Sequence, residues 1–411
     1  MTAETASKPF FKNRAFLLAG LCVLLLLAIF SLWNGLESLR WGWRFDRAKA
    51  LLAGHDAEGA FPLLDRCAQD NSSSAEAAFY AGRAARMTGR LDLAKTWLDR
   101  ARGRGWAEVA VEIEQVLLGL QAGAVVPYQA LAEKYLEVEQ PDRPRILEVL
   151  TLHHLRRLEL PAARKYAEEW TRAEPDNPSA WNQWGTLEAR SNNDKNAEDA
   201  YRKALALDPS STAALEGLAI VLRKLRQPEE ALLLVRKLEQ IAPDRPGLDK
   251  LAGATLADNG QADQAVTRLR RAVAVNPADN EAAVELSKVL LAKGVPAEAR
   301  KVLEPVITRA PFDREALDAM AGVLGRMGER DEEAKVRSRL ETVRRDLKLA
   351  DDYMAEIGKD PRAVGPRLSL AELLWKNGRL GDATRWAESV LEIQPANEAA
   401  KAILQKARQA R

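Results

Sequence analysis

The chain has 411 residues, of which 47% are apolar and 29% charged, and its formal net charge is +2. A chain of this length can bury a large apolar surface. A charge so close to balance gives no reason to expect nucleic acid or a strongly acidic partner. The two cysteines, Cys22 and Cys67, lie far apart and are too few for a disulfide framework or a zinc site.

The first predicted element is an apolar helix. Residues 1–14 form a short tail that carries Lys8, Lys12 and Arg14, and residues 15–33 contain no charge. A helix of that length spans roughly 30 Å, about the hydrocarbon thickness of a bilayer. The alternative is a cleaved signal peptide, but the apolar run is longer than usual for one and no small-x-small site closes it. We therefore expect a retained, single-pass membrane anchor.

The flanking charges and aromatic residues bear on how this anchor is placed. Arg14 adjoins the apolar run, whereas the positive charges on the other side begin seven residues beyond it. This asymmetry favours a cytoplasmic N-terminus, with the rest of the chain on the extracytoplasmic side of the cell membrane. Residues 34–40 are a predicted linker. Trp33, Trp41 and Trp43 suit an interfacial belt, while packing of Trp41 and Trp43 on the first folded element is the alternative.

Residues 41–330 show a period of 34 residues. Prolines recur at this step, at Pro141, Pro175, Pro209, Pro243, Pro277 and Pro311. Alanines recur twelve residues before a proline, at Ala163, Ala197, Ala231, Ala265 and Ala299. Because proline ends a helix and a small residue lets two helices approach, the period predicts eight to nine helical hairpins. Glycine or asparagine marks the turns within them, at Gly89, Asn192, Asn193, Gly260, Gly294 and Gly328.

The period breaks after Pro311, and residues 331–363 follow a different pattern. Within 331–357, apolar residues are spaced alternately by four and three, which predicts one long helix ended by Gly358 and Pro361. The seam is either a surface for self-association or the packing of a long helix across its own and the following hairpin. We favour the second interpretation. A final repeat over 364–397 and a capping helix over 398–411 complete the chain.

The best copy of the repeat, residues 178–211, resembles the tetratricopeptide repeat (TPR) family. The matching residues are Trp181, Trp184, Gly185, Ala197, Tyr201, Ala204 and Pro209, with Glu188 in place of the usual tyrosine. The resemblance covers roughly residues 41–411, although the copy at 109–143 is poor. It implies an all-α fold, a right-handed superhelical solenoid of antiparallel helix pairs, preceded here by the transmembrane helix.

The resemblance also implies a binding surface, because the first helices of such repeats line a concave groove. The positions that contact ligands in the family correspond here to Arg145, Glu148, Leu152, Leu155, Arg156, Asn182, Thr186, Arg190, Glu216, Arg223, Lys224, Lys250 and Lys288. The set is mixed in sign with a modest basic excess. It lacks the clamp with which chaperone-binding members hold a carboxylate, so an extended peptide or a helix of a partner protein is the expected ligand.

Catalysis is not expected, and neither is a cofactor or a metal. The sequence has no metal-hydrolase, nucleotide-binding or nucleophile-elbow motif. His153 and His154 point about 100° apart on a helix and cannot chelate one metal together. We expect them, with His55, at the surface or the groove edge.

Two classes of function follow. The first is a membrane-anchored, non-catalytic scaffold or adaptor that binds protein partners. The alternative is a structural component that forms homo-oligomers through 331–357, or a regulatory subunit of an envelope enzyme complex.

Overall fold

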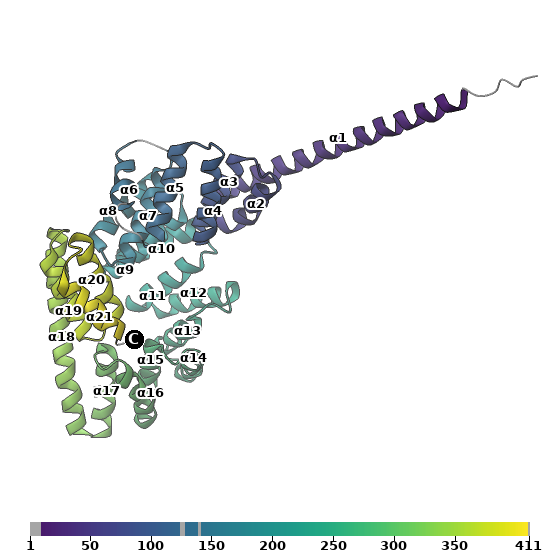
Figure 1. Ribbon diagram of the computed structural model, residues 1–411. Coiled ribbons are helices and arrows are strands. Elements are labelled where there is room, and N and C mark those ends of the chain that lie inside the picture. Colours follow the sequence, from purple (N-terminus) through teal and green to yellow (C-terminus); the bar gives the residue numbers. More distant parts are fainter. Residues whose placement is uncertain (1–9, 124–127, 139–140, 410–411) are drawn as a thin grey trace, which may run out of the picture. The chain divides into compact units, whose positions relative to one another are not determined.

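The computed structural model describes residues 10–123, 128–138 and 141–409, with the side chains of 10–30 and 34 left outside that description. These residues form helices joined by turns, and the described ranges hold no strand (Figure 1). The chain divides into two compact units, Met1–Glu137 and Val138–Arg411.

Consecutive helices pair as antiparallel hairpins within each unit. Unit 1 contains α1 (Phe10–Ala53), α2 (Ala57–Asp70), α3 (Ala75–Met87), α4 (Leu91–Gly103), α5 (Glu108–Gln121) and α6 (Tyr128–Leu136). Unit 2 contains α7 (Arg143–Arg156), α8 (Leu160–Ala173), α9 (Pro178–Arg190), α10 (Asp194–Leu207), α11 (Thr212–Lys224), α12 (Pro228–Ile241), α13 (Leu248–Asp258), α14 (Ala262–Val275), α15 (Asn280–Ala292), α16 (Pro296–Arg309), α17 (Arg314–Met327), α18 (Arg330–Lys359), α19 (Val364–Lys376), α20 (Leu380–Ile393) and α21 (Glu398–Gln409).

Helix α1 is continuous over 44 residues, so the predicted linker 34–40 is part of the helix. Its C-terminal end packs on the first repeat, where the indole of Trp41 donates a hydrogen bond to the carbonyl of Cys67 at 2.9 Å. Trp33 and Trp43 are exposed. Most of the predicted anchor 15–33 lies outside the described side chains. Among the side chains that are described, no helix is long and apolar enough to cross a membrane.

The periodic residues of the sequence occupy the framework of the hairpins. The five alanines at the 34-residue step are fully buried, and each lies in the second helix of its hairpin. Asn192 and the glycines predicted in the turns have positive φ, the left-handed conformation that these residues tolerate.

A second series of residues at the same step lies at the start of the first helices of the hairpins from α9 to α17. The side chains of Asn177, Ser211, Asp279 and Asp313 cap α9, α11, α15 and α17 by accepting backbone N–H hydrogen bonds. Arg245 occupies the one intervening position and cannot accept such a bond. Helix α13 accordingly starts later, after Gly247 in the left-handed region at φ 82°, and has 11 residues where α11 and α15 have 13.

Helix α18 packs across two hairpins, as the favoured interpretation of the heptad seam predicts. Leu340 and Val343 in its first half pack on Leu317 of α17. Ala350 and Ile357 in its second half join the core of α19 and α20. These seam residues are buried within one chain, so self-association through 331–357 would require this packing to open.

Unit 2 closes on itself where the turn between α7 and α8 meets α19 and α20 (Figure 1). The guanidinium of Arg157 donates two hydrogen bonds to the carboxylate of Glu392, at 2.9 and 2.8 Å, across 235 residues of sequence. Glu159 lies 3.2 Å from Arg157 and 3.5 Å from Arg367 of α19. We call Arg157, Glu159, Arg367 and Glu392 the closure cluster.

The expectation of surface or groove-edge histidines is wrong for His153 and His154, which are both 3% exposed. Helix α8 covers this end of α7, and the ring of His154 stacks on Tyr166 at a centroid distance of 5.4 Å. The Nδ1 atom of His154 lies 2.7 Å from the carboxylate of Glu159. Both histidines therefore belong to the packing beside the closure cluster.

This burial predicts that unit 2 loses stability in mild acid. Burial, followed by the nearby His154 and Arg157, lowers the pKa of His153 from 6.5 to about 4. The unfolded chain therefore binds the proton first, and the stabilisation present above pH 6.5 is lost as the pH falls toward 4. The expected loss is about 3 kcal/mol at pH 4.

Urea denaturation at pH 7 and at pH 4.5, with hydrogen exchange of the amides of unit 2 as the probe, measures the free energy of unfolding at each pH. In His153→Leu the difference between the two pH values should shrink, because the titrating group is gone. The exposed His55→Asn serves as the control and should leave the difference unchanged. Equal pH dependence of His153→Leu and the unaltered chain would refute the assignment.

Candidate functional site

The predicted groove residues of α11, α13 and α15 share one face of unit 2. Arg223 of α11 pairs with Asp258 of α13 at 2.6 Å and lies 3.6 Å from Glu285 of α15. One side chain thus reaches the next two first helices of the array. Arg190 of α9 makes the corresponding link to α7, because its guanidinium donates a hydrogen bond to the carbonyl of Leu155 at 2.9 Å. The family resemblance predicts that this shared face is the concave, ligand-binding face.

The predicted basic excess of this face is largely neutralised by neighbouring acids. Glu216 pairs with Arg245 at 2.6 Å, Lys250 with Glu281 at 2.7 Å, Lys288 with Glu285 at 3.0 Å and Lys224 with Asp194 at 3.3 Å. Burial would lower the pKa of Lys250, but its hydrogen bonds to Glu281 and Asp279 raise it. Lys288 pairs within its own helix, whereas the other three ion pairs join neighbouring hairpins, a role that a list of ligand positions does not anticipate.

Helix α9 presents a different set. The side-chain oxygen of Asn182 is buried and has no hydrogen-bond partner within the described part of the chain. Thr186, one turn further along, accepts a hydrogen bond from the hydroxyl of Tyr201 at 3.2 Å, while Arg190 is exposed. A buried amide oxygen without a partner costs free energy, and a ligand N–H would satisfy it.

The members of the predicted set on α7 are more scattered. Arg145 pairs with Asp142 at 3.0 Å, and Glu148 is half-buried. Arg156 is exposed, and partial burial lowers its pKa. Leu152 is half-buried and Leu155 buried. The structure thus brings together the residues from α9 to α15, with α7 joined to them through Arg190.

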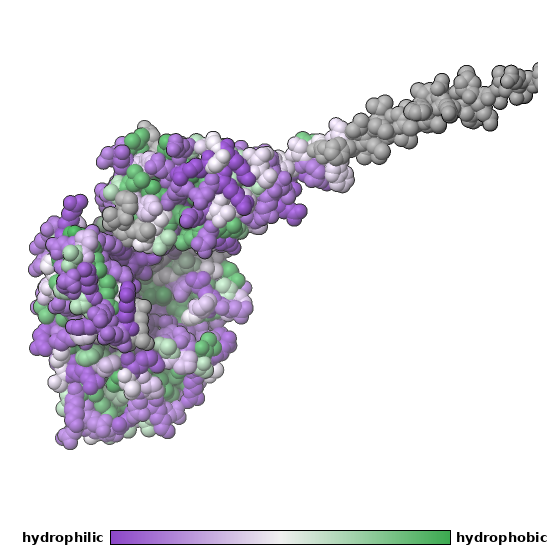
Figure 2. Space-filling model, in the orientation of Figure 1, coloured by the Kyte–Doolittle hydropathy of each residue, from purple (hydrophilic) through white to green (hydrophobic). Residues whose placement is uncertain are grey.

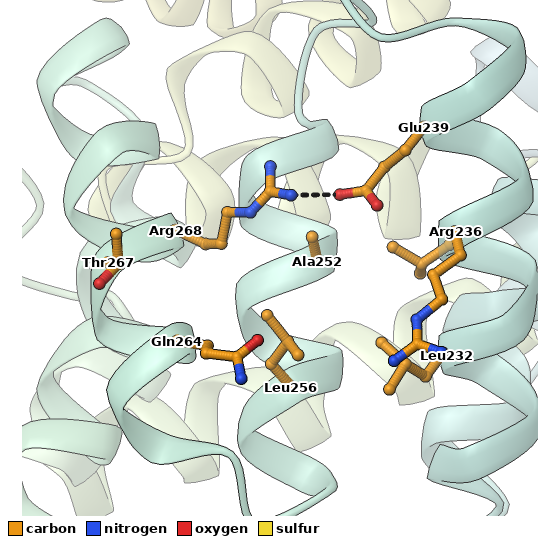
Figure 3. A pocket seen from close by; sticks show the side chains of 9 residues that line it. Leu232, Arg236, Glu239, Ala252, Leu256, Gln264, Thr267 and Arg268 are labelled. Atoms are coloured by element: carbon orange, nitrogen blue, oxygen red, sulfur yellow. Dashed lines mark hydrogen bonds and ion pairs between the residues drawn. The ribbon is translucent and has the colours of Figure 1, made fainter.

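A pocket that the sequence analysis missed opens between α12 and α14 (Figure 3). Its volume is about 280 Å³, and Ala252 and Leu256 of α13 form its floor. Arg268 of α14 and Glu239 of α12 close one end with an ion pair of 2.6 Å. Arg236 also lines the pocket.

The pocket lies where one framework side chain is missing. Stepping by 34 residues from Ala252 gives Trp184, Leu218, Leu286 and Met320, all large. Leu286 is buried in one core cluster with Leu269 of the preceding hairpin and Leu303 of its own. Alanine at 252 leaves the equivalent space open, so the same 34-residue comparison could have found the pocket from the sequence.

Filling this space should stabilise unit 2. In Ala252→Leu the added side chain buries apolar surface in a preformed cavity, and we expect a gain of about 0.5–2 kcal/mol in the free energy of unfolding. Urea denaturation compares the variant with Ala254→Leu, which adds the same atoms at a site that is already closed and should destabilise. A loss of stability in Ala252→Leu would show that the pocket is not free space.

In the described ranges, no group of three or more His, Cys, Asp and Glu side chains is placed to hold a metal ion. Figure 2 shows hydrophilic side chains over most of the visible face of unit 2. The structure thus presents a broad, polar helical surface, and the pocket between α12 and α14 has a mixed polar and apolar lining.

The fold defines a helical-repeat protein, an array of antiparallel hairpins. Family models described as tetratricopeptide repeat match residues 45–108, 182–246 and 256–323, and these stretches are tetratricopeptide repeats. Such repeats bind other proteins and peptides and are generally non-catalytic.

Among curated proteins, the chain is similar to "Cellulose synthase operon protein C" of Xanthomonas axonopodis pv. citri (strain 306), at 28% identity over 40% of this chain and 11% of that protein. The protein of the same name from Pseudomonas fluorescens (strain SBW25) is 30% identical over 39% of this chain and 12% of its own length. The chain thus matches about a tenth of these relatives.

The solved structures to which the chain is similar have lower sequence identity to it than these curated proteins do. A tetratricopeptide repeat protein from Parabacteroides merdae is 16% identical, with a TM-score of 0.40 over 65% of this chain and 99% of that chain. MamA from Desulfovibrio magneticus RS-1 is 22% identical, with a TM-score of 0.37 over 41% of this chain and 96% of that chain.

Proposed function

We propose that this chain is a membrane-anchored, non-catalytic scaffold that binds an extended peptide or a helix of a partner protein along the concave face of unit 2. The observation that carries the proposal is the buried, unpartnered side-chain oxygen of Asn182. A peptide backbone supplies N–H donors at regular spacing, and one of them can satisfy this oxygen once the Asn182 amide turns toward the surface.

The neighbouring residues suit the same ligand. Arg190 lies two turns beyond Asn182 on α9 and is exposed, so it can pair with an acidic group of the partner. Ile220 of α11 is 40% exposed and lies one turn from Arg223, which places an apolar contact on the same face. Elsewhere on this face, ion pairs already occupy most of the charges, and we assign those residues to stabilising the array.

The membrane part of the proposal rests on the sequence of residues 15–33, which carry no charge and end at Trp33. The asymmetry of the flanking charges favours an extracytoplasmic position for both units. A reporter fused after the last residue tests this directly, because a cytoplasmic signal would reverse the proposed topology.

Asn182→Ala separates binding from stability. Because the oxygen is unpartnered, Asn182→Ala should lower the free energy of unfolding by no more than about 0.5 kcal/mol. Asn182→Ala combined with Arg190→Glu should abolish partner capture by the full chain from its own membranes. Quantitative mass spectrometry of the captured proteins measures the effect.

The matched control is Arg236→Glu, the same charge reversal at an exposed arginine on the second helix of a hairpin. This variant should retain the captured partner. Loss of capture in Arg236→Glu together with retention in the Asn182 and Arg190 variant would move the binding surface to the pocket between α12 and α14.

One observation favours a second candidate, a regulatory subunit of an enzyme complex. The curated relatives carry a name that refers to a cellulose synthase operon. Co-purification of a polysaccharide synthase with the full chain would support this candidate, and capture of other proteins alone would count against it.

A further inference from the structure

An apolar ridge on α1 faces away from the first repeat. Leu32, Leu36, Leu39 and Trp43 are 66%, 50%, 72% and 67% exposed. Their spacing of four, three and four residues places them on one face of the helix. The opposite face holds Trp41 and Phe45, which pack on the first repeat.

The ridge has the pattern of a helix that pairs with another helix. Apolar residues at alternating steps of four and three form the seam of a left-handed coiled coil. In the sequence, leucine occurs at every seventh position along this stretch, at Leu18, Leu25, Leu32 and Leu39. The pattern stops where α1 enters the first repeat, because the next seam position is Asp46, with an exposed side chain.

We infer that a second copy of this chain covers the ridge, so that two α1 helices pair in parallel. The inference rests on the proposed membrane anchor, since two anchored copies present the same ridge at the same height above the membrane. In a parallel pair each seam residue meets its own counterpart, and apolar side chains tolerate this arrangement.

The surroundings of the ridge suit such a pair. The charged residues Glu37 and Arg40 are 3.3 Å apart and pair with each other on the same helix. Gly35 and Gly42, beside the ridge, have open space where a side chain would be, so a second backbone can approach closely there.

The bilayer is the competing cover. From Leu32 to Trp43 the ridge extends about 16 Å along the helix axis. Residues 15–33 already account for the hydrocarbon thickness. Leu39 and Trp43 therefore lie beyond the depth that the bilayer core covers.

Cysteine cross-linking of the full chain in its own membranes tests the pairing. The background carries Cys22→Ala, while Cys67 stays because it is buried and free. Leu39→Cys places a thiol on the ridge, and Ser38→Cys places one at the neighbouring exposed position on another face. With a mild oxidant, Leu39→Cys should form a disulfide-linked dimer and Ser38→Cys should not, because a disulfide requires a Cα–Cα distance of about 4.4–6.8 Å.

A second variant checks that the ridge itself holds the pair. Leu36→Glu should abolish the cross-link of Leu39→Cys, whereas Glu37→Gln should leave it intact. No dimer from Leu39→Cys, or equal dimer from both cysteine positions, would overturn the inference. If the chain is absent from the membrane fraction, the proposed anchor fails, and the same comparison on the soluble chain still decides whether the ridge pairs.

Discussion

Replacing Glu114 by glutamine should destabilise unit 1 by about 3–5 kcal/mol, the usual cost of leaving buried charges without their partner. Glu114 of α5 is fully buried, and its two carboxylate oxygens accept hydrogen bonds from Nε of Arg83 and Nε of Arg86, both at 2.6 Å. Both arginines lie on α3 and are themselves buried. Glutamine keeps the shape of the side chain but leaves two positive charges in the core.

Hydrogen exchange reports this effect separately for the two units. Amides of α3 and α5 should lose protection in Glu114→Gln, while amides of α13 and α15 should keep theirs. Glu108→Gln is the control, an exposed acid in the first turn of the same helix, with an expected cost below about 1 kcal/mol. A change of less than 1 kcal/mol in Glu114→Gln would mean that water reaches the two arginines.

Reversing the charge of Glu392 should open the closure of unit 2. In Glu392→Arg two guanidinium groups face each other where a bidentate ion pair existed. The side chains of Arg157 and Glu392 are only 17% and 26% exposed, and we expect a loss of about 2–4 kcal/mol. The radius of gyration from small-angle X-ray scattering should rise, because no covalent link joins α8 to α20 directly.

The compensating change provides the control for this prediction. Arg157→Glu combined with Glu392→Arg should restore part of the stability and the compact radius. An unchanged radius in Glu392→Arg at neutral pH would show that apolar packing alone closes unit 2.

The closure cluster should also weaken in strong acid. Burial alone would raise the pKa of Glu159, but the hydrogen bond from His154 and the charges of Arg157 and Arg367 lower it to about 2. The contribution of Glu159 to stability is therefore complete above pH 4.5 and fades between pH 4.5 and 2.

The sequence predicted the hairpins because each depends on residues close together in the chain. The alanine at every 34th position and the glycine or asparagine at each turn act within one hairpin, so their spacing is enough to place them. The poor copy at 109–143 shows where this approach fails. Its first helix contacts the preceding hairpin through the buried ion pairs of Glu114 as well as through Val111 and Leu118, and no apolar period reveals a buried charge.

The closure cluster could not be predicted from local patterns. The contact between Arg157 and Glu392 depends on the summed rotation of all the intervening hairpins, which no single repeat determines. The expectation of surface histidines failed for a different reason, because α8 covers the end of α7 that carries His153 and His154. Likewise, the spacing rule assigned Arg223, Lys250 and Lys288 to the predicted binding face but did not show that neighbouring acids already pair with them.

The proposed binding surface can be tested within one hairpin by site-specific photo-cross-linking. Ile220 of α11 and Leu233 of α12 are both apolar and exposed, at 40% and 63%, and lie on the first and second helix of the same pair. With a benzophenone amino acid at each position in turn, we expect the full chain to form an adduct with its partner in cells from position 220 and not from position 233. An adduct from position 233 alone, or equal adducts from both, would contradict binding along the concave face.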